Sequence, residues 1–434
     1  MTYTIKTISE TSPMTSKKKL PLLLLIFVLF ASTSNTLNAM NIVNTMWPYD
    51  TSIRPTFNNL HWWQVAFYAE GGFHNAKGFD NEGSVANPLR IWNCQQNALA
   101  MLEGFPEGST IDQFRAALLD SDNGIRGRFL VDGDLQLNFS AAFAANFYFA
   151  SDWRIGLYLP VYKMTLKDVA FIDQTPNIDN LDKLVHELLT DNLAQNVREL
   201  GCLDIGGWDR AGVGDLTLLV EWFRDFKQHK PFLKNVRVNW RWGIGFPTGL
   251  RENEDLIFAV PFGYDGAVSM PFGLGLDMTL GKYFKCGIDV QLTQIFGHTR
   301  TRRIKTDLEQ TELLLLEKTQ VFKDSGLVQR FNLDFEFYRF LKGLSFKVTY
   351  QYLKQGDADY SLKTQEFSTN IANTSIRLEN FTMHHMIPKF TYDCGYHWPE
   401  GRIRPELGLY MRLPFNGKNV ALFPTVGGVI SLDF

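Results

Sequence analysis

The stretch Asn235-Val236-Arg237-Val238-Asn239-Trp240-Arg241-Trp242-Gly243-Ile244-Gly245-Phe246 alternates strictly between two kinds of residue. Valine, tryptophan, isoleucine and phenylalanine occupy the even positions, and arginine, asparagine and glycine occupy the odd ones. A period of two places successive side chains on opposite faces of a β-strand. The stretch therefore predicts a strand with one apolar face and one polar face.

The same alternation returns later in the chain, over 330–340 and 344–352. The alternating runs last about 10 to 14 residues, which is the length that a tilted strand needs to cross a bilayer. Strands in soluble proteins are shorter, roughly 5 or 6 residues. The length and number of these runs favour a membrane-spanning sheet.

We expect twelve such strands, near residues 61–74, 128–150, 153–164, 212–224, 232–247, 267–280, 282–297, 327–340, 343–356, 380–393, 402–413 and 423–434. The connections alternate between short turns and long loops, as in outer-membrane barrels. The sequence therefore predicts an all-β fold, a transmembrane antiparallel up-and-down β-barrel whose two termini are periplasmic. Splitting the long segment 128–150, or adding 89–101, raises the count towards 14.

Helical insertions are expected in two of the long loops, near 75–127 and 165–211. Leucine and valine recur at helical spacing over 179–199, which predicts an amphipathic helix there. Such a helix either covers its loop or reaches into the lumen.

The first 39 residues have the order of a signal peptide. Lys17, Lys18 and Lys19 precede the apolar run 20–31, and the small residues that follow end at Ala39. The apolar run is too short to cross a membrane as a helix. We expect 1–39 to be a signal peptide and 40–434 to be a single barrel domain in the outer membrane.

Composition agrees with a barrel and excludes other classes. Phe and Gly are abundant, at 35 and 34 residues, and the mean hydropathy is only −0.14, too low for a bundle of membrane helices. A net charge of −3 gives no reason to expect a nucleic-acid partner. The expected partners are outer-membrane lipid, the barrel-assembly machinery and a small solute.

The C-terminus ends in an alternating segment whose last residue, Phe434, shares a face with Leu432 and Ile430. This ending resembles the C-terminal signature of outer-membrane barrels, in which the final strand is read by the assembly machinery. We therefore assign Phe434 as the assembly signal.

Alternation also predicts which charged side chains face the lumen. The candidates carry both signs, so they indicate either a structural network of ion pairs or the wall of a polar conduit, without strong ion selectivity. They are Arg237, Arg241, Asp277, Asp289, Arg330, Asp334, Glu336, Lys347, Arg404, Glu406 and Arg412.

No catalytic, metal or cofactor site is predicted. The sequence lacks the hydrolase, zinc-protease and P-loop motifs. His384 and His385 are adjacent, but neighbours on a strand face opposite ways and cannot bind one ion together. Cys94 and Cys202 either form a disulfide or remain free thiols.

Two glycine-rich motifs carry a family resemblance. Gly212–Leu218 (GVGDLTL) and Gly243–Gly249 (GIGFPTG) resemble the strand opening and strand end of barrel proteins grouped as MetA-pathway phenol-degradation transporters, which are related in style to long-chain fatty-acid transporters. The resemblance covers roughly 128–297 and implies a barrel that takes up hydrophobic compounds. It transfers no binding residue, and the insertions near 75–127 and 165–211 depart from the group.

The leading hypothesis is a channel for passive uptake of small solutes, hydrophobic ones included, and not an enzyme. The alternatives are a structural or surface-interaction barrel, and an outer-membrane hydrolase.

Overall fold

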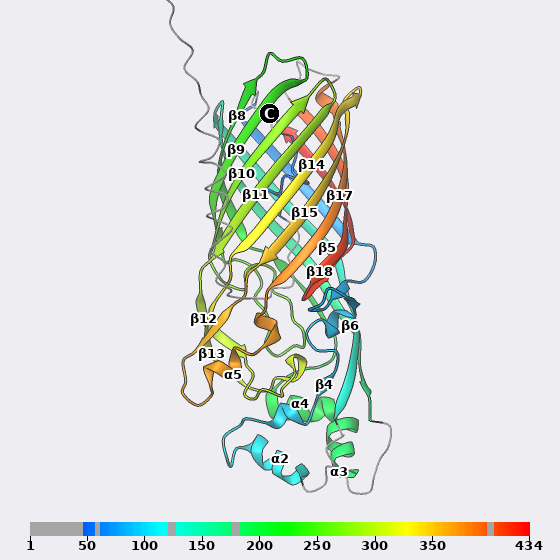
Figure 1. Cartoon of the computed structure of the whole chain (residues 1–434), viewed down its shortest axis with the longest axis vertical. Helices are drawn as coiled ribbons and strands as arrows, with labels where there is room; N and C mark the ends of the chain where they lie inside the picture. The colour runs from blue at the N-terminus through cyan, green and yellow to red at the C-terminus, as the bar shows by residue number, and fades with distance from the viewer. Residues whose placement is uncertain (1–46, 57–60, 120–126, 176–182, 397–402) are drawn as a thin grey trace, which may run out of the picture. The chain divides into compact units, whose positions relative to one another are not determined.

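The computed structural model describes residues 47–56, 61–119, 127–175, 183–396 and 403–434. Within them, long antiparallel strands form one closed ring (Figure 1). The twelve strands of the ring are β1 (Trp63–Gly72), β5 (Arg128–Ala150), β6 (Trp153–Asp173), β8 (Leu216–Lys227), β9 (Leu233–Phe246), β10 (Ser269–Leu280), β11 (Phe284–Ile295), β14 (Val328–Leu341), β15 (Leu344–Gln355), β17 (Phe381–Asp393), β18 (Arg404–Lys418) and β20 (Thr425–Asp433). The predicted all-β, up-and-down barrel is confirmed.

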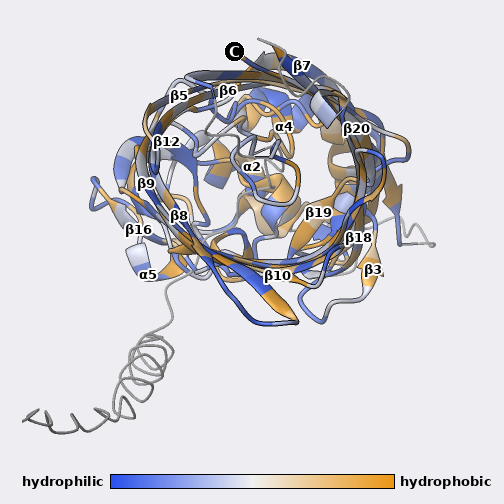
Figure 2. Cartoon of the chain, turned by 90° about the horizontal axis from the view of Figure 1, so that it is seen from above, coloured by the Kyte–Doolittle hydropathy of each residue, from blue (hydrophilic) through white to orange (hydrophobic). Residues whose placement is uncertain are grey.

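Neighbours in the ring are neighbours in the sequence of long strands, and β1 pairs with both β5 and β20 to close it (Figure 2). At this seam Gln64 lies opposite Asp433, and the backbones of Trp63 and Phe434 exchange two hydrogen bonds of 2.9 Å. The last residues of the chain therefore complete the wall.

Each of the twelve predicted segments overlaps one strand of the ring. The predicted ends at 164, 224 and 413 were too early, since β6 runs on to Asp173, β8 to Lys227 and β18 to Lys418. Segment 128–150 is the single strand β5. The part of β5 near Arg128 and the part of β6 near Asp173 pair with each other and extend beyond the rest of the wall at the long-loop end. Segment 89–101 contains only the two-residue strand β4 (Gln96–Asn97) and two short 3-10 turns. The alternative count of fourteen is therefore not observed for the ring.

The remaining elements gather at one end of the barrel, the long-loop end (Figure 1). They include two small sheets, several short helices and the strand β7, which extends the wall beside β6. Their bounds are β2 (Lys77–Phe79), β3 (Val85–Ala86), β7 (Trp208–Val213), β12 (His298–Arg303), β13 (Lys318–Asp324), β16 (Asp359–Leu362), β19 (Val420–Leu422), α2 (Thr110–Leu119), α3 (Lys183–Val185), α4 (Leu193–Gly201) and α5 (Thr369–Ala372).

The helix predicted over 179–199 is present in its described part. It consists of α3, a π-helical turn over 186–191, and α4. Val185, Leu189, Leu193 and Val197 are buried, so the apolar stripe packs against the loops at this end.

The opposite end, the short-turn end, has tight connections. Gly281 lies between β10 and β11 with φ +60°, and Gly343 lies between β14 and β15 with φ +100°. Glycine adopts these backbone angles without the strain that a Cβ would cause. Short turns at one end and long loops at the other were predicted and are observed.

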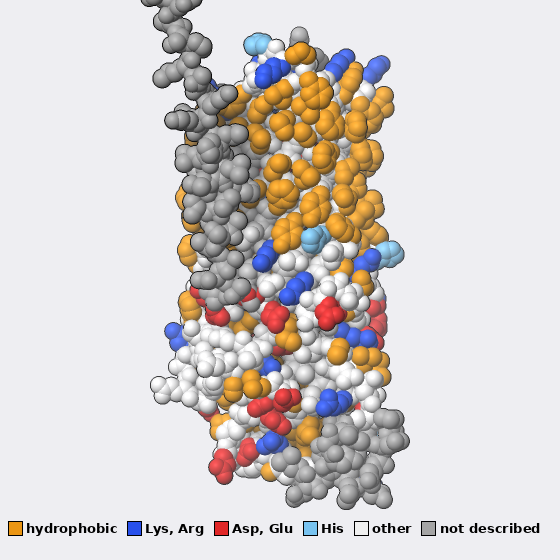
Figure 3. All heavy atoms as spheres, in the orientation of Figure 1, with side chains coloured by type: hydrophobic (Ala, Val, Ile, Leu, Met, Phe, Trp, Pro, Cys, Tyr) orange, Lys and Arg blue, Asp and Glu red, His pale blue; other side chains and the backbone are white. Residues whose placement is uncertain are grey.

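An apolar belt covers the outer face of the ring, and Figure 3 shows one side of it. Its members are large side chains that alternate with inward polar ones, such as Leu274, Ile288, Phe335, Phe390 and Leu409. Lipid is the environment that such a belt requires. In the part of the chain that the structure describes, no helix is long and apolar enough to span a membrane.

Two further sequence expectations have separate outcomes. The signal peptide predicted for 1–39 lies outside the described residues. All four cysteines are free, and Cys94 and Cys202 are both exposed. The alternative of a Cys94–Cys202 disulfide is therefore not observed.

Placing a charge in the middle of the belt is expected to destabilise the barrel. Leu274→Arg puts a guanidinium on the lipid face of β10, where such a change costs roughly 2–4 kcal/mol. Unfolding by guanidinium chloride in lipid vesicles measures the loss. The control Leu308→Arg, in a loop where Leu308 is 60% exposed, should change stability by less than about 0.5 kcal/mol. Equal losses would contradict a lipid-facing belt.

Candidate functional site

The inner face of the barrel carries paired charges. Arg241 on β9 donates two hydrogen bonds to Asp289 on β11, at 2.6 and 2.7 Å. Its Nε donates a third bond to Gln291, at 3.1 Å. All three side chains are buried. A buried ion pair is tolerated when its other hydrogen-bonding groups are also satisfied, and this pair meets that condition.

Glycines on β10 and β11 make room for polar side chains of the neighbouring strands. A Cβ at Gly273 of β10 would lie 2.5 Å from Nε of Arg241, which crosses β10 to reach its partner. A Cβ at Gly287 would lie 2.3 Å from the carboxylate of Asp277. The missing side chains let polar groups lie flat against the inner wall.

Residues 47–56, called the plug, lie inside the ring and are anchored by Asp50. The carboxylate of Asp50 lies 3.3 Å from Arg330 on β14. It also accepts hydrogen bonds from Asn332, at 2.7 Å, and from Gln351 on β15, at 2.6 Å. Asp50 is completely buried. Three donors on two strands therefore hold one plug side chain.

Lysines on two strands hold the plug by its backbone. Nζ of Lys347 donates to the carbonyl oxygen of Thr51, at 2.6 Å. Nζ of Lys389 on β17 donates to the carbonyl oxygens of Ile53 and Arg54, at 2.9 and 2.8 Å. These contacts do not depend on which side chains the plug carries.

The other wall of the lumen contacts the plug as well. Arg54 lies 2.8 Å from Glu221 on β8, which also pairs with Arg154 on β6. The hydroxyl of Tyr68 on β1 donates to the carbonyl oxygen of Pro48, at 3.0 Å. On β6 the ring of Tyr158 packs on that of Tyr49, with centroids 5.4 Å apart. Contacts thus come from β1, β6 and β8 as well as from β14, β15 and β17. The plug spans the lumen from wall to wall.

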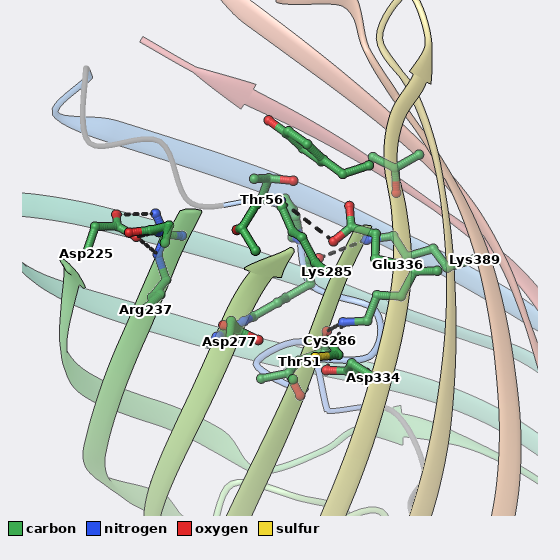
Figure 4. Close-up of a pocket in the computed structure, with 18 residues that line it drawn as sticks. Thr51, Thr56, Asp225, Arg237, Asp277, Lys285, Cys286, Asp334, Glu336 and Lys389 are labelled. Atoms are coloured by element: carbon green, nitrogen blue, oxygen red, sulfur yellow. Dashed lines mark hydrogen bonds and ion pairs between the residues drawn. The ribbon is translucent and has the colours of Figure 1, made fainter. Parts of the chain in front are cut away.

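A polar cavity of about 240 Å³ lies between the plug and the inner faces of several strands (Figure 4). Arg237 pairs with Asp225 at 2.7 Å, and Lys285 lies 3.7 Å from Glu336. Asp277 points into the cavity, and no hydrogen bond or ion pair joins it to the described residues. The cavity is therefore polar and nearly balanced in charge.

The structure places the eleven charged candidates on the inner wall in four settings: a pair of two candidates, the cavity, contact with the plug, and ion pairs with other wall residues. Arg241 and Asp289 pair with each other, and Arg237, Asp277, Asp334 and Glu336 line the cavity. Arg330, Lys347 and Glu406 contact the plug, since Glu406 accepts from the backbone N–H of Thr56 at 3.1 Å. Arg404 lies 3.5 Å from Asp393, and Arg412 lies 3.4 Å from Glu70.

Sequence reasoning missed the plug itself. Asp50 and Arg54 lie in a short segment with no periodicity, and their partners are distant in sequence. The one available signal was the pair of opposite charges among aromatic residues just before the first strand. His384 and His385, by contrast, lie as expected: His385 is buried inside the ring, and His384 lies outside beside Tyr350.

The strand pairing is interrupted where β7 and β8 meet, at Gly214 and Asp215, although single backbone hydrogen bonds remain there, from Gly214 to Pro160 at 2.8 Å and from Leu250 to Val213 at 2.9 Å. β8 pairs with β9 only as far as Leu216, and β7 pairs with β6 alone among the named strands. The carboxylate of Asp215 accepts from the backbone N–H groups of Gly249, at 2.9 Å, and Tyr264, at 2.6 Å. The two glycine-rich motifs therefore meet at this break.

A groove of about 910 Å³ opens beside the break, at the long-loop edge of the apolar belt. Val213 and Leu250, both close to 40% exposed, give it an apolar side. Arg251, Asp255 and Lys318 give it a charged rim. The groove is therefore amphipathic and starts where β7 lacks a second partner strand.

Ion pairs between buried side chains hold the loop between β9 and β10 that borders this groove. Asp265 in this loop pairs with Arg300 on β12, and Glu254 lies 3.0 Å from the same guanidinium. Burial, together with the neighbouring Glu252 carboxylate, raises the pKa of Glu254 to about 7. Among the described residues, no group of three or more His, Cys, Asp or Glu has the geometry of a metal site.

A closed sheet leaves no unpaired edge in lipid, and an apolar belt outside with a polar interior completes the arrangement. The chain is an outer-membrane β-barrel. No family model and no curated protein matches its sequence.

Solved structures do resemble it. An outer membrane channel of Pseudomonas putida F1 matches with a TM-score of 0.47 and 10% identity, over 90% of this chain and 100% of the other. The toluene transporter TbuX of Ralstonia pickettii matches with a TM-score of 0.31 and 11% identity, over 86% and 89%. The toluene transporter TodX of P. putida matches with a TM-score of 0.30 and 10% identity, over 86% and 90%. At such identities the likeness concerns the fold.

Glu254→Gln is expected to remove a pH dependence from the loop between β9 and β10. The pKa of Glu254 is higher in the folded loop than its ordinary value of 4.5. Stability that is fully present below pH 4.5 is therefore lost as the pH rises to about 7. Amide hydrogen exchange of the loop at pH 5 and pH 8, corrected for intrinsic rates, should show protection falling about tenfold or more in the wild type.

The Glu254→Gln variant should keep its protection against amide hydrogen exchange at pH 8. Glu309→Gln, at an exposed position of the neighbouring loop, is the control and should behave as the wild type. An unchanged pH dependence in Glu254→Gln would contradict this assignment.

Proposed function

We propose that this protein is a passive channel for the uptake of small hydrophobic solutes across the outer membrane. The observation that carries the proposal is the break in strand pairing at Gly214–Asp215, with an amphipathic groove at the edge of the lipid-facing belt. Hydrophobic solutes concentrate in such a boundary, whereas the plugged lumen offers hydrophilic solutes no wide aqueous path.

The residues around the break favour entry of apolar molecules. Gly214 lies against the ring of Tyr162, and a Cβ there would lie 2.9 Å from that ring. Phe262 packs on the same Tyr162 ring, with centroids 5.5 Å apart. Aromatic rings therefore lie directly behind the break. Gly212, Gly214 and Gly249 pack closely against Leu250, Tyr162 and Phe262, so the break is closed in this structure, and a solute that enters here has to displace these contacts.

The plug supplies the closed state of the channel. It contacts the wall through ion pairs and backbone hydrogen bonds, each of which water can replace when the plug moves. The cavity below it is polar, so a solute that passes the plug is released into water. Because positive and negative side chains alternate on the wall, the path has no strong preference for one sign of ion.

The proposed orientation places the short-turn end, both termini and Phe434 on the periplasmic side. Barrels of this kind have short periplasmic turns and long outer loops. A signal peptide over 1–39 delivers the chain to that side, and the assembly machinery receives the final strand that ends at Phe434. A cofactor and a catalytic role have no part in this proposal.

Removing the plug is expected to open a water-filled pore. Deletion of 47–56 leaves the wall charges without their partners, and ions and water then replace them. Single-channel recordings in planar bilayers should give a conductance at least several-fold above that of the wild type. Lys389→Met, which loses the bonds to Ile53 and Arg54, should give a smaller increase, and Lys227→Met, an exposed residue at the short-turn end, should give none.

A full-length channel that conducts as well as the deletion variant would contradict the plug as a closed state. If no variant conducts and no solute passes, the alternative of a structural or surface-interaction barrel gains support. Lipid hydrolysis that depends on a single serine would support the hydrolase alternative.

A charge in the groove is expected to slow hydrophobic solutes selectively. Leu250→Asp makes the apolar side of the groove polar, so entry of a monoaromatic hydrocarbon into proteoliposomes should fall several-fold. The single-channel conductance should stay unchanged. Val85→Asp, at an exposed position of another loop, is the matched control. Equal effects on both measurements, or none on hydrocarbon entry, would contradict a path through the groove.

A further inference from the structure

Three polar residues form a row on the outer face at the long-loop edge of the belt. Thr382 on β17 lies opposite Lys354 of β15 on one side and opposite Lys418 of β18 on the other. Their neighbours in sequence, Leu353 and Met383, are buried inside the ring, so the row faces outward. Adjacent strands are about 4.8 Å apart, which places the two lysine backbones roughly 10 Å from each other.

Neither lysine is neutralised by the protein. No ion pair or hydrogen bond joins the side-chain ammonium group of Lys354 or of Lys418 to another described residue. By contrast Lys163, an outward lysine of β6, lies 3.2 Å from Asp209. The carboxylate of Glu379, an acidic residue near this edge, accepts from Nδ2 of Asn419 at 3.2 Å. The adjoining loop brings Asp80 and Glu82 close to Lys418, since the backbone N–H of Asn419 donates to the carbonyl oxygen of Asp80 at 3.0 Å. The carboxylate of Asp80 accepts from the N–H groups of Glu82 and Ser84 in its own loop. The row itself therefore carries two positive charges and no acidic side chain.

An aromatic shelf lies directly below the row, toward the centre of the belt. Tyr352 pairs with His384, with ring centroids 5.0 Å apart, and Phe415 lies 5.9 Å from His384. The hydroxyl of Tyr350 lies 2.9 Å from Nδ1 of His384. Amphipathic rings of this kind occupy the level of lipid headgroups. The lysines are therefore at headgroup height, with a surface for acyl chains beneath them.

We propose that Lys354, Thr382 and Lys418 bind a phosphate group on the headgroup of a glycolipid in the leaflet at the long-loop end. Flexible ammonium groups from two directions can meet on one phosphate, and the hydroxyl between them donates a further hydrogen bond. Half-buried lysine stems lie along the apolar wall while their charges reach the headgroups. With the orientation proposed above, this is the outer leaflet.

A free phosphate ion is not the ligand that this surface fits. The row lies flat on the outside of the wall without a buried donor, so phosphate alone gains little there. A lipid adds contact of its acyl chains with Tyr350, Tyr352 and Phe415. The row fits the phosphate group of such a lipid, and the aromatic shelf fits its acyl chains.

The test compares lipid binding by the full-length protein and the double variant Lys354→Ala/Lys418→Ala. The probe is a bisphosphorylated lipid A, titrated in detergent and followed by native mass spectrometry, with the same lipid lacking both phosphates as the second arm. Each lysine near a membrane surface contributes about 1 kcal/mol to binding of anionic lipid, so the double variant should bind roughly tenfold or more weakly.

The matched control is Lys227→Ala/Lys234→Ala, which removes two exposed lysines from the short-turn end and should bind as the wild type. Lys354→Arg/Lys418→Arg should keep binding, because the charge remains. A gel shift on heating verifies that each variant is folded. Inorganic phosphate at millimolar concentration should not compete.

Equal binding of both lipids by the wild type would overturn the proposal, and so would full binding by the double alanine variant. Competition by inorganic phosphate would assign the row to a free ion instead of a lipid. These outcomes are independent of conductance and hydrocarbon entry, so the row is tested separately from the proposed transport.

Discussion

Backbone hydrogen bonding between neighbouring strands is the constraint on which this structure depends. Hydrocarbon offers no partner to an unpaired N–H or C=O group, so a sheet can cross it only as a closed ring. Here the ring closes at the seam of β1 with β20, where Trp63 and Phe434 exchange two hydrogen bonds. Once the ring is closed, the alternation of side chains decides which face each one takes: one face meets lipid, and the other lines a narrow lumen in which most charged side chains are paired.

The interior follows from that narrowness. Some charged side chains of the wall pair with each other, as Arg241 does with Asp289. The plug supplies oxygen partners for three other cationic side chains of the wall, those of Arg330, Lys347 and Lys389. The lumen is thus closed by the same interactions that make its charges tolerable. The wall itself is weakest where the strand pairing is incomplete, at Gly214–Asp215, and there the carboxylate of Asp215 replaces missing strand contacts by binding two backbone N–H groups.

The sequence predicted what has a period and missed what has none. Alternation over 235–246 and 330–340 located strands to within a few residues, because a lipid-facing side chain at every second position leaves a direct trace. The segment read as a strand over 212–224 is broken at Gly214–Asp215, a feature of pairing rather than of alternation. The plug left no trace, since the partners of Asp50 and Arg54 lie 280 and 167 positions away and no local pattern reports them. The inward charges were predicted as a set, but their partners depend on the register between strands.

The glycines of the inner wall couple the evolution of positions that are distant in the sequence. Gly273 exists so that Arg241 can cross β10, and Gly287 leaves space for Asp277. A larger residue at either glycine is compatible with the fold only if the facing side chain shortens at the same time. Among relatives of this chain, small residues on one strand and long polar residues on the next should be inherited as pairs, and a lineage that loses one member should soon lose the other.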